Sequence, residues 1–250
     1  MATSAPPRTD TASDSETAFR FLSKGDVEVL GLLPDSSNYT FLAKLTHEGA
    51  QTLGVLKPRR GETPLWDFPH GTLAAREVAA YEVSRASGWD LVPPTVLRED
   101  TPLGDGSLQL FVEHDPERHY FVLAEEAGRD LRTFAALDVV INNADRKGGH
   151  VLEDKSGRLW AVDHGVSFHV EPKLRTVIWA YADEAIGEQV ERGLTTLEAE
   201  LEPGAGLRDR LDELLAPEEV VATRGRIHGL LSSGRFPKPG SERPLPWPLI

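Results

Sequence analysis

Two polar motifs that lie close together in the sequence constrain this chain more than any of its other features. The first, 142–150 (NNADRKGGH), follows an apolar run at 134–141 whose spacing predicts a helix. The second, 163–165 (DHG), ends an apolar stretch at 159–162 that is typical of a short strand. With a further short strand at 151–152, the pattern predicts a helix, a polar loop and a hairpin that ends in D-x-G.

Two aspartates, Asp145 and Asp163, are the candidates for chemistry in these motifs. In-line phosphoryl transfer needs one carboxylate near the acceptor hydroxyl and another that holds a divalent cation against the nucleotide phosphates. Asp145 is then the catalytic base and Asp163 the metal ligand. Because Asp and Gly are common turn residues, each motif taken alone is more typical of an ordinary polar turn.

The segment upstream predicts a small antiparallel sheet. Strands are expected at 27–33 and 39–45, on either side of a polar turn at 34–38, and a third strand is expected at 51–56. Lys57 follows the third strand directly, so its ammonium lies at a strand end near the predicted hairpin. A cation in that place suits the α and β phosphates of a nucleotide.

A helix is predicted at 72–86, because apolar residues recur there at helical spacing and alanine is frequent. Glu77 lies early in this helix. In kinases, an ion pair between a third-strand Lys and a Glu of the next helix fixes the lysine. Lys57 and Glu77 are the candidates for that pair. The alternative is that Glu77 belongs to an ordinary solvated helix face.

The segment 109–114 is predicted to be an apolar strand that runs into polar residues. We expect it to form the connection between two lobes, with backbone groups of Phe111, Val112 and Glu113 that receive an adenine. For the side chains, a purely structural role in the strand is the simpler interpretation.

Four segments taken in order carry a resemblance to a known family: VLKPRRGE, REVAAYEV, LDVVINNADR and AVDHGVSF. Together they resemble the phosphatidylinositol 3- and 4-kinase-like branch of the protein-kinase-like fold. They are most similar to the divergent type II phosphatidylinositol 4-kinases and their bacterial relatives. The resemblance covers 27–185, and its motifs are specific as a set but weak singly.

The resemblance implies a two-lobed α+β protein-kinase-like fold, with a small antiparallel N-lobe that carries one helix and a mainly helical C-lobe. It also implies ATP-dependent phosphotransfer with Mg²⁺ or Mn²⁺ as the second cofactor. Lys57 would then contact phosphate, Asp145 would lie at the reaction centre and Asp163 would bind the metal.

The resemblance also bears on the turn that covers the phosphates. In that group a serine-containing turn takes the place of a glycine-rich loop, and Ser36, Ser37 and Asn38 fit it. This chain departs from the family at His150, five residues after Asp145, where the family usually has Asn.

His150 leaves three outcomes open: it binds a different metal, leaves the metal to Asp163 alone, or accompanies a loss of catalysis. Imidazole nitrogen is a softer ligand than an amide oxygen and is better suited to manganese or zinc than to magnesium. If His150 binds the metal, activity should favour Mn²⁺ and fall as the pH drops through about 6.5. A single histidine is more often structural than a ligand.

Composition and hydrophobic pattern divide the chain into four parts. With 250 residues, 40% of them hydrophobic, it can bury one sizeable core or two lobes. The expected parts are a polar disordered tail, a nucleotide-binding N-lobe, a catalytic helical C-lobe and a Pro-rich C-terminal tail, at 1–16, 17–113, 114–235 and 236–250.

Helical spacing predicts four further helices in the C-lobe, at 178–185, 195–201, 207–215 and 217–231. The last of them begins with a proline, which the first turn of a helix tolerates. Five prolines follow after Phe236, so this end of the chain is expected to be an extended strap or a disordered tail.

Charge and composition exclude several partners and compartments. A net charge of −13 argues against binding nucleic acid and against adsorption to anionic membranes, both of which require clustered Lys and Arg. No segment reaches the ~18 apolar residues of a membrane span or resembles a signal peptide, so the cytoplasm is the expected compartment and no stable membrane insertion is expected. The absence of cysteine excludes disulfides and thiolate chemistry.

The acceptor is the least determined part of the prediction. After D-H-G, only Lys173 and Arg175 are candidates for contact with an anionic lipid headgroup. We therefore rank a protein or a small polar molecule above a phosphoinositide as acceptor. The sequence does not determine the oligomeric state.

Three classes of function remain after this reasoning. A kinase uses every motif described above, and transfer of AMP is a variant of it that needs the same metal carboxylate. A nucleotide-binding pseudokinase with a regulatory role would explain His150 by loss of catalysis. A metal-dependent hydrolase would use His150, His164 and Asp163 as ligands but would leave Lys57 and Glu77 without a role.

Overall fold

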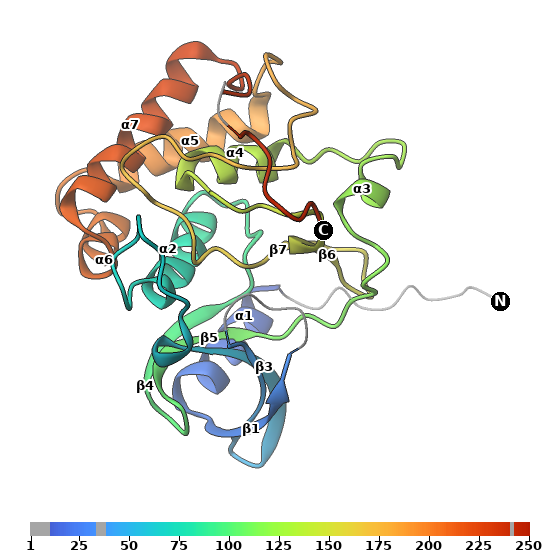
Figure 1. Cartoon of the computed structure of the whole chain (residues 1–250), viewed down its shortest axis with the longest axis vertical. Coiled ribbons are helices and arrows are strands. Elements are labelled where there is room, and N and C mark those ends of the chain that lie inside the picture. Colours follow the sequence, from blue (N-terminus) through green and yellow to red (C-terminus); the bar gives the residue numbers. More distant parts are fainter. Residues whose placement is uncertain (1–10, 34–38, 241–242) are drawn as a thin grey trace.

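The two predicted lobes are present in the computed structural model, which describes residues 11–33, 39–240 and 243–250 (Figure 1). One lobe is a twisted antiparallel sheet with a helix against it, and the other is built mainly of helices. Within the described residues, no helix is both long and apolar enough to cross a membrane.

The N-lobe sheet has five strands in the order β1-β2-β3-β5-β4. Their bounds are β1 Asp26–Leu32, β2 Phe41–His47, β3 Ala50–Pro58, β4 Thr95–Thr101 and β5 Gly104–Leu110. The strands predicted at 27–33, 39–45 and 51–56 are therefore present, shifted by at most a few residues. β4 was not predicted, because its second half (Arg98, Glu99 and Asp100) is charged and the strand lies at the sheet edge, where polar residues are tolerated.

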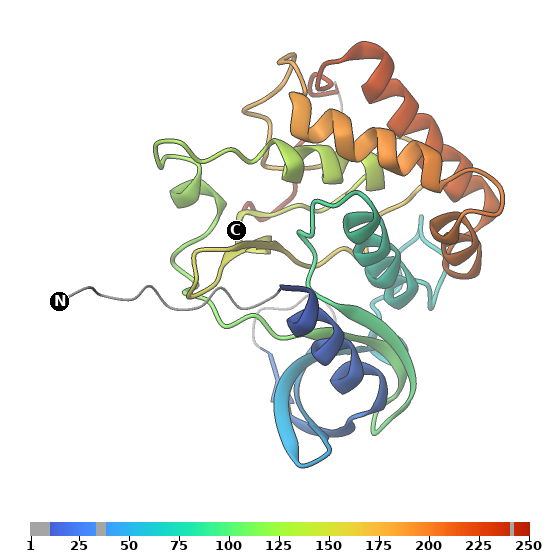
Figure 2. The same cartoon turned by 180° about the vertical axis from the view of Figure 1, so that it is seen from behind.

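Helix α1, Thr11–Lys24, corrects the predicted disordered tail at 1–16, because 11–16 are helical. Residues 1–10 lie outside the described residues. The helix packs against the sheet (Figure 2). Its Leu22 is fully buried in a cluster with Leu45, Leu56 and Leu108. A polar segment can extend a helix once an apolar anchor of this kind holds the next turns in place.

Helix α2, Leu73–Ala86, lies between the sheet and the helical lobe, in contact with β4 and β5 on one side and with α5 and α6 on the other (Figure 2). Nearly all its residues are buried, including charged ones such as Arg76 and Glu77. The helix therefore has no solvated face of the usual kind, and the alternative interpretation of Glu77 as a surface residue is wrong.

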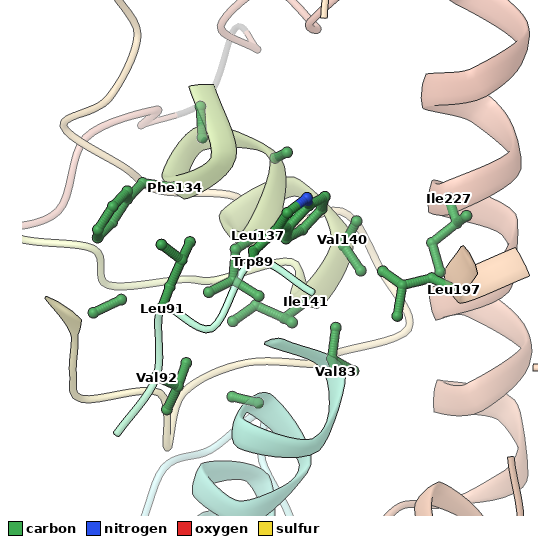
Figure 3. Close-up of a cluster of buried hydrophobic side chains, with 14 of the residues drawn as sticks. Val83, Trp89, Leu91, Val92, Phe134, Leu137, Val140, Ile141, Leu197 and Ile227 are labelled. Carbon is green, nitrogen blue, oxygen red and sulfur yellow. The ribbon is translucent and has the colours of Figure 1, made fainter. Parts of the chain in front are cut away.

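The C-lobe contains α3 Tyr120–Leu123, α4 Arg132–Ile141, α5 Glu188–Glu200, α6 Gly206–Leu214 and α7 Pro217–Ser233, together with the hairpin of β6 Val151–Glu153 and β7 Leu159–Ala161. Leu137, Val140 and Ile141 of α4 lie in the core, where Figure 3 shows Trp89 beside them. Leu197 of α5 and Ile227 of α7 close the other side of this cluster. This packing fixes α4 and therefore the loop that follows it.

The helix predicted at 178–185 is wrong, since this segment forms turns and an isolated β-bridge between Ala185 and Arg235. Besides local turn bonds, its backbone bonds to the chain after α7: Phe236 N donates to Glu184 O at 3.0 Å, and Asp183 N donates to Phe236 O at 3.2 Å. Tertiary partners have replaced the helical bonds that the local spacing favoured.

In its described parts, 236–240 and 243–250, the Pro-rich segment runs extended along the C-lobe. Of the two predicted forms, an extended strap and a disordered tail, these parts take the first. Phe236 is buried at its start. Thr176 N donates to Pro244 O at 3.1 Å, and Gly148 N donates to Leu249 O at 2.7 Å. The strap therefore contacts the loop that carries the first polar motif.

Candidate active site

A cleft between the lobes brings together Lys57, Glu77, Asp145 and Asp163, which come from β3, α2 and the two polar motifs. The space between these residues, including the open solvent at its mouth, is about 480 Å³. The rest of its lining consists of Tyr39, Pro58, Glu62, Leu73, Ala74, Gly165 and Val166. Four of the residues chosen from the sequence thus lie in one solvent-accessible site.

Lys57 lies between two carboxylates at the end of β3. Its Nζ forms an ion pair with Glu77 Oε1 and another, of 2.8 Å, with Asp163 Oδ1. Burial alone would lower the pKa of Lys57, but the charges of Asp163 and Glu77 raise it above its usual value. The lysine is a fixed cation, and the ion pair expected between Lys57 and Glu77 is present.

Glu77 is held from both sides. Its Oε1 pairs with Lys57, and its Oε2 accepts a hydrogen bond of 3.0 Å from the backbone N of His164. The neighbouring Arg76 anchors the helix to the C-lobe, since its guanidinium donates to Ser167 O at 2.6 Å and to Glu219 Oε1 at 2.7 Å. This buried arginine fixes the turn of α2 that presents Glu77.

Asp163 adopts a left-handed backbone conformation, with φ of 61°, which turns the chain sharply after β7. Its side chain is 43% exposed and faces the cleft. Burial of the carboxyl opposes ionisation, but Lys57 and the nearby imidazole of His150 hold the pKa of Asp163 well below its usual range. The group is an anion at any working pH and is a strong ligand for a cation.

His150 lies with its Nε2 at 3.3 Å from Asp163 Oδ2. Burial lowers its pKa to about 4, so the ring is neutral at physiological pH. The usual imidazole pKa of about 6.5 does not apply to this ring, because the pH would have to fall to about 4 to charge it, and the pH dependence of activity stays a prediction. Lys147 N donates to Nδ1 at 3.4 Å, which places the ring proton on Nε2, facing Asp163.

Asp145 opens the loop on the other side of the cleft. Its backbone N donates to Asn143 Oδ1 at 2.9 Å, and its Oδ2 lies 3.3 Å from Lys147 Nζ. Burial raises the pKa of Asp145 above its usual value, although Lys147 opposes the shift. A carboxylate with a raised pKa is a stronger general base.

A buried polar network that sequence reasoning missed supports both motifs. Arg146 is fully buried and pairs with Asp138 of α4 through Nε, at 2.9 and 3.2 Å from the two carboxylate oxygens. Its other nitrogens donate to Val162 O at 2.8 Å and to His164 Nε2 at 2.7 Å. The available signal was Asp138 itself, a carboxylate inside the apolar run 134–141 that needs a partner when buried.

The structure does not bring the predicted adenine contacts into this cleft. β5 ends at Leu110, so Phe111, Val112 and Glu113 follow the strand. Phe111 N donates to Leu53 O at 3.1 Å, and Val112 O is 2.8 Å from His114 Nδ1. Glu113 pairs with a surface lysine, Lys155, at 2.6 Å. Their contact with a nucleotide stays a prediction, as does that of Ser36, Ser37 and Asn38, which lie outside the described residues.

The donor set of the cleft fits a cation that also binds phosphate. Within the part of the chain that the structure describes, no group of three or more His, Asp or Glu is arranged to hold a metal ion. Asp163 and His150 offer one oxygen and one nitrogen ligand, and Mg²⁺ and Mn²⁺ sites of this kind complete their coordination with phosphate oxygens and water. His164 is fully buried with its Nε2 bonded to Arg146, which removes the third ligand of the hydrolase hypothesis.

Solved structures of kinase-like proteins share this fold. Hydra Fam20, solved with sugar, superposes with a TM-score of 0.56 over 90% of this chain and 90% of its own, at 14% identity. The Helicobacter pylori proinflammatory kinase CtkA superposes with a TM-score of 0.52 over 86% of this chain and 94% of its own, at 8% identity. The two-lobed α+β kinase-like fold predicted from the sequence is thereby confirmed.

Sequence comparison adds a partial match to plant lipid kinases. Phosphatidylinositol 4-kinase gamma 4 of Oryza sativa subsp. japonica is 29% identical over 52% of this chain, and the protein of the same name in Arabidopsis thaliana is 31% identical over 46%. The matches span only 27% and 25% of the plant proteins, so they support a kinase-like domain and no more.

A full-length relative exists in Mycobacterium tuberculosis (strain ATCC 25618 / H37Rv). Its protein Rv2133c is 40% identical, and the match covers 95% of this chain and 96% of that protein. No protein-family model matches the chain. Identity of this size over nearly the whole of both proteins means that the chain belongs to the family of protein Rv2133c.

Proposed function

We propose that this chain is an ATP- and metal-dependent phosphotransferase that acts on a hydroxyl acceptor. The observation that carries the proposal is the arrangement of Lys57 between Glu77 and Asp163, with Asp145 in the same cleft. A fixed cation, a fixed anion and a separate base are the groups that phosphoryl transfer requires of a protein. The kinase-like fold supports the same conclusion.

In this proposal the nucleotide phosphates enter between Lys57 and Asp163. Lys57 contacts the α and β phosphates, and Glu77 holds its ammonium in place. Asp163, with His150 beside it, would hold a divalent cation, which would supply the positive charge that neutralises the phosphates. For Nε2 of His150 to act as a ligand, the ring proton would have to lie on Nδ1, which would cost the hydrogen bond that Nδ1 accepts from Lys147 N.

Asp145 then accepts the proton of the acceptor hydroxyl. The hydroxyl oxygen forms the new bond to the γ-phosphorus as the bond from that phosphorus to ADP breaks, and Lys57 would neutralise part of the negative charge on the leaving ADP. The raised pKa of Asp145 favours this proton transfer.

For the acceptor, we propose a protein or a small polar molecule in preference to a phosphoinositide. The plant matches are to phosphatidylinositol 4-kinases, which favours a lipid. Against it, the net charge is −13, and Lys173 is already paired with Asp67 at 2.8 Å. Of Lys173 and Arg175, the two candidates for contact with a lipid headgroup, Arg175 is then the one that remains. Transfer of labelled phosphate to phosphatidylinositol vesicles would contradict this ranking.

A second candidate function, a nucleotide-binding pseudokinase, is favoured by His150. This residue replaces the usual metal-binding amide, and its Nε2 proton faces the metal carboxylate. Nucleotide binding without turnover, together with phosphotransfer gained in His150→Asn, would place this candidate first. Turnover that is faster with Mn²⁺ than with Mg²⁺ would support the kinase and make His150 a ligand.

The proposal is tested by thermal unfolding with ATP, with and without Mg²⁺ or Mn²⁺, and by measuring ADP formation. At a free nucleotide concentration of ~100 Kd the expected stabilisation is about 5–11 °C, and it should require the metal. Asp163→Asn should abolish this metal-dependent shift, whereas Asp145→Asn should keep it and lose turnover. The exposed Asp212→Asn on α6 is the control and should match the parent.

Equal stabilisation by ATP without metal would contradict the proposed metal site. Parent-like turnover in both Asp145→Asn and Asp163→Asn would refute the kinase proposal as a whole.

A further inference from the structure

The central residue of D-H-G, His164, has no role in the chemistry proposed above, yet it is fully buried between the two halves of the site. Its ring Nε2 lies 2.7 Å from Arg146 Nη2, and its backbone N donates to Glu77 Oε2 at 3.0 Å. The ring therefore touches the arginine that follows Asp145, and the backbone touches the glutamate that holds Lys57.

The hydrogen-bond partners determine which ring nitrogen carries the proton. An arginine only donates, so Nε2 of His164 must accept from Arg146 and cannot itself be protonated. The proton of the neutral ring is on Nδ1, which is buried and has no hydrogen-bond partner among the described residues. Nδ1 lies 4.0 Å from Glu77 Oε2, beyond hydrogen-bond distance, but its N–H dipole still attracts the carboxylate.

These contacts form a continuous buried path across the site. Asp138 of α4 binds Arg146, Arg146 binds His164, His164 binds Glu77, and Glu77 binds Lys57. The path joins the helix before the first motif to α2 and β3 of the other lobe. His164 is the one link of this path that contributes a side-chain contact on one side and a backbone contact on the other.

We propose that His164 is a positioning residue, which sets the place of Glu77, and through it of Lys57, relative to the loop of Asp145 and Arg146. The inference rests on the proposed phosphotransferase function, because in phosphoryl transfer the distance between Lys57 and Asp145 would determine the rate. His164 itself does not touch the reacting atoms.

Three substitutions separate the contacts of the ring. His164→Phe keeps an aromatic ring but removes both nitrogens. His164→Gln places an amide oxygen near the position of Nε2, so it can still accept from Arg146. His164→Asn places an amide near Nδ1 and loses the contact with Arg146. The control is His228→Phe on α7, the same substitution at a side chain that is 72% exposed.

We expect His164→Phe to lower kcat on the order of 10- to 100-fold, as loss of a supporting hydrogen bond around a site typically does. The KM for ATP should change less than kcat, because alignment and not the phosphate contact is lost. His164→Gln should recover part of kcat and His164→Asn should recover less. In ¹⁵N spectra of the parent's histidine rings, the Nδ1 of His164 should be protonated and its Nε2 should be unprotonated.

A proton on Nε2, parent-like kinetics in His164→Phe, or no recovery in His164→Gln relative to His164→Phe would each overturn the inference. If His164→Phe does not fold, the comparison of Gln with Asn decides. A parent protein that binds no nucleotide would refute the proposed function instead, and the ring spectrum would still decide whether His164 accepts from Arg146.

Discussion

The buried pair of Asp138 and Arg146 offers the sharpest test of how the site is supported. Both side chains are essentially inaccessible to solvent, and Asp138 also accepts hydrogen bonds from Asn143 Nδ2 at 3.1 Å and Thr176 Oγ1 at 2.9 Å. Asp138→Asn keeps the size of the side chain but removes its charge. The guanidinium of Arg146 would then remain buried without a counter-charge.

Removing one partner of a buried ion pair costs about 3–5 kcal/mol of unfolding free energy, because the other charge stays desolvated. For a chain of this size that corresponds to a fall in Tm of roughly 6–20 °C. Thermal and urea unfolding of Asp138→Asn, followed by circular dichroism, would measure it. Since Arg146 also binds His164 and Val162, turnover should fall along with stability.

The matched control is Asp212→Asn, which removes the same charge from an exposed pair with Arg208 on α6. An exposed pair at this helical spacing contributes ~0.3–0.5 kcal/mol. If Asp138→Asn loses no more unfolding free energy than this control, then the buried Asp138–Arg146 pair does not stabilise the loop, and the reasoning is refuted.

Three other changes have defined outcomes. Lys57→Met should lose metal-dependent ATP binding and keep the parent's circular dichroism spectrum, because the ammonium faces the cleft and not the core. His150 should contribute up to about 3 kcal/mol to the unfolding free energy that the parent loses between pH 6.5 and pH 4, the range in which the unfolded chain binds a proton at His150 and the folded chain does not. His150→Asn should remove this contribution and reduce the slope, whereas the buried His164, whose pKa is also lowered, should keep its own. Deleting Leu249 and Ile250 should speed hydrogen exchange at the amide of Gly148, which donates to Leu249 O.

Each of these outcomes has its own control. Lys155→Met changes a lysine that is 76% exposed and should bind ATP like the parent. His228→Asn should leave the pH slope unchanged; a slope that His150→Asn does not alter would mean that the ring is not held neutral by burial. Trp247→Ala changes a residue that is 87% exposed and should leave hydrogen exchange at Gly148 unchanged. If the deletion of Leu249 and Ile250 also leaves this exchange rate at the parent's value, the strap does not hold the loop.

Periodicity predicted the elements whose core contacts are dictated by their own apolar residues. α4 and α2 are of this kind, and so are the three strands β1, β2 and β3. α1 was missed because its anchor, Leu22, follows a polar stretch that resembles a tail. The helix expected at 178–185 was wrong, because the backbone there bonds to the strap after α7, which local spacing cannot reveal.

The sequence by itself determined which side chains are chemically able to act. A lysine at a strand end and two aspartates in neighbouring turns have that ability wherever the chain places them, and the kinase-like order of Lys57, Asp145 and Asp163 predicted a common site.

Only the tertiary structure decided the state and the support of those groups. The neutral ring of His150 follows from its burial, and the ionised Asp163 follows from Lys57 and His150 beside it. The path from Asp138 through Arg146 and His164 to Glu77 joins residues from distant parts of the sequence. The physical reason is that burial and the distances between charges set a pKa or an ion-pair energy, and both exist only once the lobes have packed together.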